Sequence, residues 1–193
     1  YARAFEQTGV PLAVARGGFY ESSEVADLLN LLMLLDNPLQ DIPAITVLRS
    51  PLVGLSLAEL AAIRITAPRD HFWTALLERQ KSEGRNPKSE SANPQLELFL
   101  ERFAHWRRLA RQVSLSRCLE TVLVGTRYGD WLRGQDRGEQ RRANVRQFVE
   151  LARRFDEFQQ QGLFRFLRFV EAQQEADTGP EVAAIIDENA VRL

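Results

Sequence analysis

Apolar residues that recur three and four positions apart are the feature that most constrains the fold of this 193-residue chain. A clear example follows Asn93 and Pro94, which suit the cap and the first residue of a helix. After them come Leu96, Phe99 and Phe103. Because this spacing places apolar side chains along one face of a helix, it predicts an amphipathic helix packed on a core.

Similar signals predict helices along most of the chain. They cover residues 23–36, Pro43 to about Arg49, a helix from Ser56, residues 69–81, a helix from Ser114 or Ser116, residues 139–160, and a last helix after Gly162. The best-defined start is the S-x-x-E capping box of Ser56 and Glu59, in which each side chain bonds the other residue's amide. Between residues 82 and 93 the apolar periodicity is lost, which predicts a mobile loop.

Strand signals are confined to the two ends of the chain. Leu12–Ala15 and Ala190–Leu193 are short apolar runs of strand length. The helical residues between them would supply the long crossover that parallel pairing needs. We therefore expect a mainly α fold, a helical bundle-like body with a small parallel β contribution from the two chain ends.

Composition excludes several classes of protein. No apolar run approaches the roughly 20 residues of a membrane helix, so we expect no membrane partner. The single cysteine, Cys118, cannot form an intrachain disulfide, and with only His71 and His105 beside it no spacing suggests a zinc site. These features favour a reducing, cytoplasmic setting. Because the start YARAFEQTGV has neither an initiator Met nor a signal sequence, we expect a piece excised from a longer protein.

The sequence patterns of common catalytic sites are missing. No phosphate-binding G-x-x-x-x-G-K-[ST] occurs, and Gly17-Gly18 is not part of a dinucleotide-binding G-x-G-x-x-G. Cys118 lies at core spacing in its helix, and His105 is expected at the surface. We therefore expect no catalytic, cofactor-binding or metal-binding residues in this chain, and no enzymatic activity from it alone.

Arginine is unevenly distributed along the chain. Between Glu101 and Arg168 there are 15 arginines against 8 acidic residues, whereas the rest of the chain has 10 basic and 18 acidic residues. A basic face is typical of nucleic-acid binding, because arginine contacts phosphates with two parallel hydrogen bonds. Arg141, Arg142 and Arg146 are the candidate DNA-binding residues of this region. The alternative interpretation is a solvated helix surface.

Four segments, taken in order, resemble those of UvrD/RecB-type superfamily 1 DNA helicases. They are GGFYESSEVADLLNLLMLLDNPLQD, LRSPLVGLSLAEL, GEQRRANVRQFVELARRFD together with GLFRFLRFVE, and ENAVRL. The segments GEQRRANVRQFVELARRFD and GLFRFLRFVE are similar to the AddA-type component of a helicase-nuclease. The segment LRSPLVGLSLAEL resembles the entry into the helical subdomain that is inserted in the second RecA-like motor domain.

The resemblance implies a domain organisation and a set of partners. Residues 1–36 would be a flanking piece of the second motor domain (2A), residues 37–178 the inserted helical subdomain (2B), and residues 179–193 the return strand of 2A. The implied parent is an ATP-dependent helicase with exonuclease activity that uses ATP and Mg. The implied partners are DNA, as duplex or as a duplex/single-strand junction, the rest of the motor, and a partner nuclease subunit.

The stretch Gly17-Gly18-Phe19-Tyr20 has two interpretations. Glycines allow a turn that other residues cannot adopt, and Ser22 or Ser23 would then cap the helix that follows. In the helicases that this chain resembles, such a turn lies near the single-stranded DNA track. Phe19 or Tyr20 would pack on neighbouring elements or on a base, and packing is favoured because buried aromatics usually serve a core.

The turn Gly54-Leu55-Ser56, with Arg49 before it, is the sharpest DNA-binding candidate. Gly54 lets a ligand approach the backbone, and Ser56 caps a helix whose first amides are suited to phosphate. UvrD-like helicases have a Gly-x-Gly turn here that grips duplex DNA, whereas this chain has serine at the position of the other glycine. A plain capping box that serves stability is the alternative.

Three functions remain open from the sequence. The first is a DNA-contacting accessory subdomain of a helicase-nuclease in double-strand break repair and recombination. Another is a protein-interaction or regulatory module that docks a partner subunit. The third is an inactive helicase-like scaffold.

Overall fold

The computed structural model describes residues 12–13, 18–84, 93–159, 162–176, 179–180 and 191–192. Within these ranges the chain forms nine α-helices, one 3-10 turn and two strands of two residues each. The mainly α fold predicted from the apolar spacing is confirmed. Gly17 and most of the predicted loop at 82–93 lie outside the described residues.

The elements follow one another with short connections. In chain order they are η1 (Phe19–Glu21), α2 (Ser23–Asp36), α3 (Asp41–Arg49), α4 (Leu57–Thr66), α5 (Phe72–Gly84), α6 (Pro94–Leu109), α7 (Leu115–Thr126), α8 (Tyr128–Arg133), α9 (Gly138–Gln159) and α10 (Gly162–Glu175). None of the described helices is both long and apolar enough to cross a membrane.

The two strands are β1 (Leu12–Ala13) and β2 (Val191–Arg192), which pair in parallel with Leu12 opposite Val191. The rest of the predicted strand segments lies outside the described residues. Their membership of a larger sheet, and the domain boundaries at 36 and 178, stay predictions.

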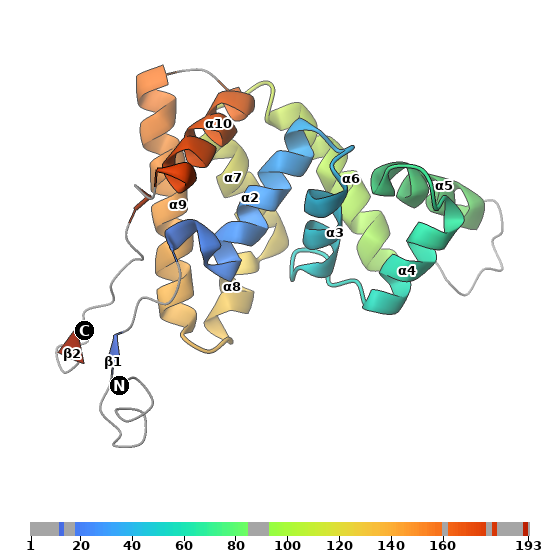
Figure 1. Cartoon of the computed structure of the whole chain (residues 1–193), viewed down its shortest axis with the longest axis horizontal. Helices are drawn as coiled ribbons and strands as arrows, with labels where there is room; N and C mark the ends of the chain where they lie inside the picture. The colour runs from blue at the N-terminus through green and yellow to red at the C-terminus, as the bar shows by residue number, and fades with distance from the viewer. Residues whose placement is uncertain are drawn as a thin grey trace.

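Helix α2 lies in the middle of the helical body (Figure 1). It packs against α3 and α6 on one side and against α9 and α10 on the other. Its buried residues are Glu24, Val25, Leu28, Leu29, Leu31, Leu32, Leu34 and Leu35. A helix that is apolar on nearly all sides must be covered on nearly all sides, which explains its central place.

Helix α6 joins the two ends of the body. In its second half, Phe103 packs against Trp73 of α5, with ring centroids 4.5 Å apart and ring planes tilted by 45°. Further along, Trp106 is buried, and its carbonyl lies 3.9 Å from the thiol of Cys118 in α7. The α3–α5 group and the α7–α10 group are therefore continuous through one hydrophobic core.

Local capping signals give the observed starts of two helices. Asn93 Oδ1 accepts hydrogen bonds from Gln95 N at 2.9 Å and Leu96 N at 3.2 Å, as its position before Pro94 predicts. Ser56 and Glu59 form the predicted capping box at the start of α4. Both starts are therefore determined by residues next to them in sequence.

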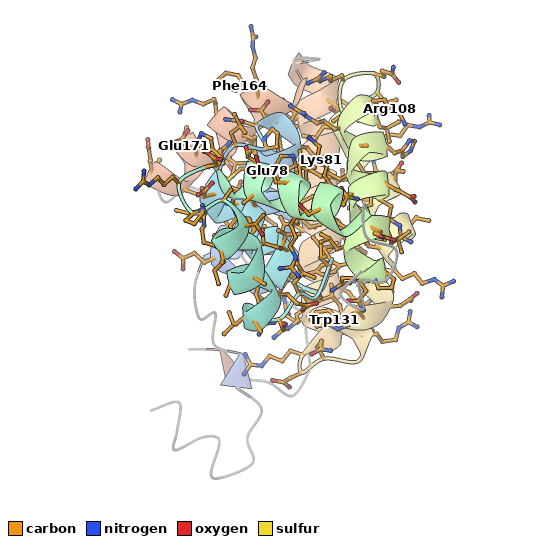
Figure 2. The ribbon with its side chains drawn as sticks, turned by 90° about the vertical axis from the view of Figure 1, so that its right-hand side faces the viewer. Glu78, Lys81, Arg108, Trp131, Phe164 and Glu171 are labelled. Carbon is orange, nitrogen blue, oxygen red and sulfur yellow. The ribbon has the colours of Figure 1, made fainter. Side chains whose placement is uncertain are left out.

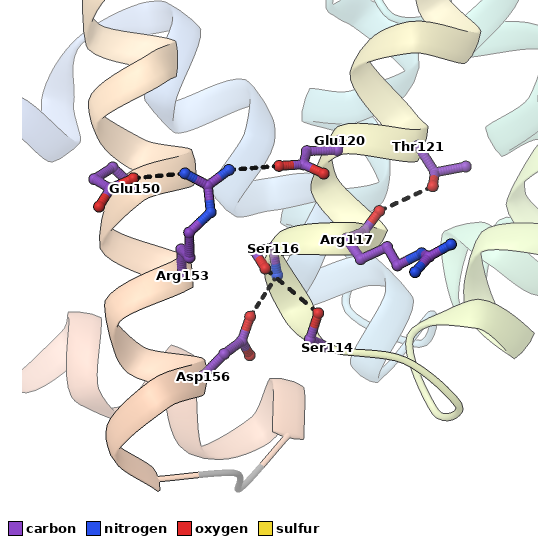
Figure 3. A network of polar contacts seen from close by, with 8 residues as sticks. All are labelled: Ser114, Ser116, Arg117, Glu120, Thr121, Glu150, Arg153 and Asp156. Atoms are coloured by element: carbon purple, nitrogen blue, oxygen red, sulfur yellow. Dashed lines mark hydrogen bonds and ion pairs between the residues drawn. The ribbon is translucent and has the colours of Figure 1, made fainter.

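Two other helix starts are capped from a distance. Helix α5 begins at Phe72, three residues later than predicted, where Asp41 Oδ1 of α3 accepts from Phe72 N at 2.7 Å. Helix α7 begins after Ser114, but the Ser114 side chain makes no capping bond. Instead, Asp156 of α9 accepts from Leu115 N at 3.0 Å and from Ser116 N at 2.9 Å. Figure 3 shows the bond to Ser116.

Replacing Asp156 with Ala should lower the free energy of unfolding by about 1 kcal/mol, because two amides at the start of α7 lose their acceptor. Chemical denaturation followed by circular dichroism measures this change. Glu157→Ala, at the next and exposed position of α9, is the matched control and should leave stability within about 0.5 kcal/mol of wild type. Equal stability of the two variants would show that the α7 cap contributes nothing.

Candidate nucleic-acid interface

The turn between α3 and α4 is closed by one carbonyl. Ser50 O accepts from Val53 N at 3.1 Å and from Gly54 N at 2.7 Å. Gly54 has φ +83°, in the left-handed region that favours glycine. The turn is therefore a fixed structure, with Gly54 exposed at its outer edge.

Leu55 and Arg49 anchor this turn to the body. The Leu55 side chain is 1% exposed, and its amide donates to Leu48 O at 2.9 Å. Arg49 Nη1 donates to Leu55 O at 3.0 Å while the residue as a whole stays exposed. The buried Leu55 side chain therefore holds the turn in place but is not available to a ligand. The exposed residues of the predicted site are Arg49, Gly54 and Ser56.

Glu59 brings a negative charge to the start of α4. Its Oε2 accepts from Ser56 N at 2.7 Å and Ser56 Oγ at 2.6 Å, and its Oε1 accepts from Asn93 Nδ2. Hydrogen bonds from the Ser56 side chain and amide hold the pKa of Glu59 below its usual value. The carboxylate is therefore ionised at neutral pH and lies against Ser56, at the helix start where phosphate binding is predicted. Whether this turn contacts DNA stays a prediction.

The three candidate arginines of α9 have different surroundings. Arg141 Nη1 lies 3.4 Å from Ser23 Oγ of α2, and Arg142 Nη1 pairs with Glu139 Oε1 at 2.9 Å. Arg146 is exposed. Because Arg141 faces α2, only Arg142 and Arg146, four residues apart, lie on one outer face of α9. DNA contact by these arginines stays a prediction.

Behind Arg141 lies a polar cluster that the sequence did not indicate. Tyr128 OH of α8 donates to Asp27 Oδ2 of α2 at 2.7 Å, and Asn144 Nδ2 of α9 donates to Glu24 Oε1 at 2.6 Å. Burial raises the pKa of the Asp27 carboxyl, and burial together with the nearby Asp27 raises the pKa of Tyr128. These bonds fasten α8 and α9 to the first turns of α2.

Phe19 and Tyr20 belong to the core. Both are buried, the Phe19 ring lies 6.5 Å from that of Phe148 in α9, and Tyr20 OH donates to Gln173 of α10. The structure confirms the favoured interpretation, in which these two rings pack on neighbouring elements. Gly18 has φ −67°, which any residue adopts, so the expectation of a glycine-only conformation is wrong at Gly18.

Arg153 and Arg107 of this arginine-rich region each link two helices. Arg153 of α9 pairs with Glu150 at 2.8 Å and with Glu120 of α7 at 2.7 Å, alongside Asp156 (Figure 3). Arg107 Nε donates to Leu35 O at the end of α2. Arg108 in the last turn of α6 and Arg111 in the connection to α7 are exposed, and the sequence analysis did not single them out.

Comparison with known proteins gives the family. No family model matches the sequence. The chain is 40% identical over its whole length to the A subunit of the ATP-dependent helicase/nuclease of Desulforudis audaxviator. It is 37% identical over its whole length to that of Pelotomaculum thermopropionicum, and 37% identical over 98% of its length to that of Natranaerobius thermophilus. The chain is homologous to the AddA helicase/nuclease. It spans about 15% of the length of these curated relatives.

The AddA homology confirms the resemblance that four separate segments indicated. Because the alignment with the Desulforudis protein covers the whole chain, both the turn at Gly54 and the α9 arginines belong to the AddA-like segment. Within the described ranges, no three His, Cys, Asp or Glu side chains lie together in a way that would hold a metal ion.

The backbone at Gly54 gives a stability prediction. Gly54→Ala should lower the free energy of unfolding by about 1 kcal/mol, because a Cβ-bearing residue at positive φ is strained by about that amount. The added Cβ would meet no atom closer than Gln95 Oε1 at 3.8 Å, so backbone strain alone is measured. Gly134→Ala, at φ −81° and with 3.6 Å of clearance, is the matched control and should show no strain cost. If Gly54→Ala and Gly134→Ala unfolded at the same denaturant concentration, backbone strain at Gly54 would be ruled out.

Cys118 gives a pH prediction. Its side chain is fully buried, and burial raises the pKa of the thiol to about 11. Since the thiolate is the reactive form, the folded protein should react with a disulfide-exchange reagent at about pH 8 at least tenfold more slowly than the unfolded protein. Time-resolved thiol titration with and without denaturant measures both rates. Rapid modification of the folded protein would show that α6 and α7 separate enough to expose Cys118.

Proposed function

We propose that this chain is a DNA-contacting helical subdomain of an ATP-dependent helicase/nuclease that acts in double-strand break repair and recombination. The observation that carries the proposal is the similarity of the whole chain to a segment of AddA-type ATP-dependent helicase/nucleases. In this proposal the subdomain is non-catalytic by itself. ATP and Mg act in the remainder of a cytoplasmic parent enzyme, and a partner nuclease subunit completes it.

The proposal divides the chain into 1–36 and 179–193 as motor-domain flanks and 37–178 as the inserted subdomain. Helix α2, on the motor side of this boundary, packs on α3, α9 and α10 of the insertion. A rigid-body movement of the insertion would therefore take α2 with it.

Within this function, the turn at Gly54 is the proposed duplex contact. The turn is rigid, its outer edge is exposed, and the first amides of α4 follow it directly. A helix start of this kind binds phosphate oxygens, and Arg49 stands beside it. The charge of Glu59 opposes such binding, so the affinity should depend on this one carboxylate.

Two opposite charge changes test the phosphate site. Leu57→Glu adds a negative charge at the first position of α4, where the side chain is 70% exposed and an acidic residue favours the helix. It should weaken duplex binding several-fold and equally for all sequences, because phosphate contacts do not read bases. Glu59→Gln keeps the capping box but removes a charge, and should tighten binding several-fold. Fluorescence anisotropy with a tailed duplex across a salt series measures both.

The matched control is Ile65→Glu, which makes a similar change at a 74% exposed position in the last turn of α4. It should bind as wild type. If Leu57→Glu and Glu59→Gln also bind as wild type, the capping box serves stability alone. Binding whose affinity does not fall with salt would argue against phosphate contacts as a whole.

One observation favours the protein-docking alternative. Leu39, Ile42 and Ile45 are exposed apolar residues three positions apart at the start and along one side of α3. Such a stripe is typical of a protein contact rather than a DNA contact. Ile42→Glu would leave DNA affinity unchanged but weaken association with a partner subunit if docking is the function.

A further inference from the structure

The connection from α7 through α8 to α9 contains an exposed tryptophan in an unusual backbone setting. Trp131 of α8 is 40% exposed, whereas Trp73 and Trp106 are buried. Figure 2 shows Trp131 near the bottom of the helical body and Phe164 near its top. We call Trp131 with Arg127 and Arg137 the Trp131 corner.

The Trp131 ring is held in place from behind. It stacks on Tyr128, with centroids 5.9 Å apart and planes 17° from parallel. Tyr128 is buried, and its hydroxyl donates to Asp27 of α2 at 2.7 Å. Because the ring beneath Trp131 is fixed to the core, little side-chain entropy remains to be lost when a flat ligand stacks on the indole.

The backbone on both sides of α8 is strained. Arg127 has φ +53° and Arg137 has φ +54°, and they are the two non-glycine residues at positive φ among the described residues. Glycine would adopt this conformation without strain, so each arginine lowers the stability of the fold relative to glycine. Strain of this kind is often found at functional sites. Both side chains are exposed, one on each side of α8.

The next residue fixes this geometry further. A Cβ at Gly138 would lie 2.5 Å from Leu132 O and 2.8 Å from Arg133 O, so only glycine lets α9 start this close to the end of α8. The position of Arg137 relative to Trp131 is therefore set by backbone packing.

We propose that the Trp131 corner binds single-stranded DNA, with an unpaired base stacked on Trp131 and neighbouring phosphates bound by Arg127 and Arg137. The corner combines an exposed aromatic ring with an exposed arginine before it and another after it in the sequence, and these are the aromatic and basic elements of single-strand binding sites. The proposal rests on the proposed function only in taking DNA as the ligand.

The local charges decide the expected character of this binding. Asp130 and Asp136 are also exposed here, and Asp130 lies 3.8 Å from Arg133. The corner is therefore only weakly positive. Stacking must supply most of the affinity, and the salt dependence should be shallower than that of a duplex site with many phosphate contacts.

The experiment uses the full chain and oligothymidylate of about eight nucleotides, within the usual size of a single-strand site. Oligothymidylate should quench the tryptophan emission saturably, because Trp131 is the exposed tryptophan. Trp131→Ala should weaken binding of a labelled oligothymidylate roughly tenfold, and Trp131→Phe should weaken it less. Phe164→Ala, at an aromatic residue that is 61% exposed on α10, is the matched control and should bind as wild type.

Arginine-to-glycine variants test the phosphate contacts without damaging the fold. Arg127→Gly combined with Arg137→Gly removes two charges and relieves two strained backbones, so unfolding should occur at the same or a higher denaturant concentration. The slope of log affinity against log salt should fall by about 1.4, or about 0.7 for each lost contact to a single strand.

Three results would overturn the proposal: no oligothymidylate binding by wild type, wild-type affinity in Trp131→Ala, or an unchanged salt slope in the double glycine variant. Failure of this proposal can be distinguished from failure of the proposed duplex site at Gly54. Duplex binding that responds to Leu57→Glu but not to Trp131→Ala retains the turn at Gly54 and rejects the Trp131 corner. The reverse pattern rejects the turn alone.

Discussion

Burial of α2 on nearly every side is the constraint on which the rest of the described structure depends. From Glu24 to Asp36 none of its residues is fully exposed. Each buried leucine contributes roughly 1.5–3 kcal/mol only if other helices cover it. Helices α3, α6, α9 and α10 supply that cover, and α7 and α8 are positioned by packing on α9 in turn. The order of the bundle follows from the need to surround one apolar helix.

Carboxylates that reach between helices set the register of this packing. Asp41 links α3 to the start of α5, and Asp156 links α9 to the start of α7. Arg64 Nη2 lies 2.7 Å from Asp41 Oδ2, so the same carboxylate also binds α4. The bonds to the amides of Phe72, Leu115 and Ser116 satisfy donors that a helix start leaves without partners, and they form only at one relative position of the two helices.

Some helix starts are capped by adjacent residues and others by a distant carboxylate, and this difference explains which starts could be predicted from the sequence. Starts capped by adjacent residues, at Asn93 and Ser56, were predictable because the signal is local. The start of α5 at Phe72 was not, because its cap lies 31 residues earlier in Asp41. The six-residue helix α8 is too short to show apolar periodicity.

The candidate site was predictable to a smaller extent. The left-handed turn at Gly54 and its capping box have local signatures. A count of arginines, in contrast, does not show that Arg153 of α9 forms an ion pair with Glu120 of α7. The positive φ of Arg127 and Arg137 has no sequence signal, because arginine rarely adopts it.

The two candidate DNA contacts are both connected to α2, one by a side-chain bond and the other through α3. Near its start, Asp27 binds Tyr128 and so fixes the Trp131 corner. Near its end, Leu35 O accepts from Arg107, and α3 with the turn at Gly54 follows after a short connection. Because α2 is covered along its length, bending it would expose leucines to water at a cost of about 25 cal/mol per Å². Both candidate surfaces are therefore connected through this one covered helix.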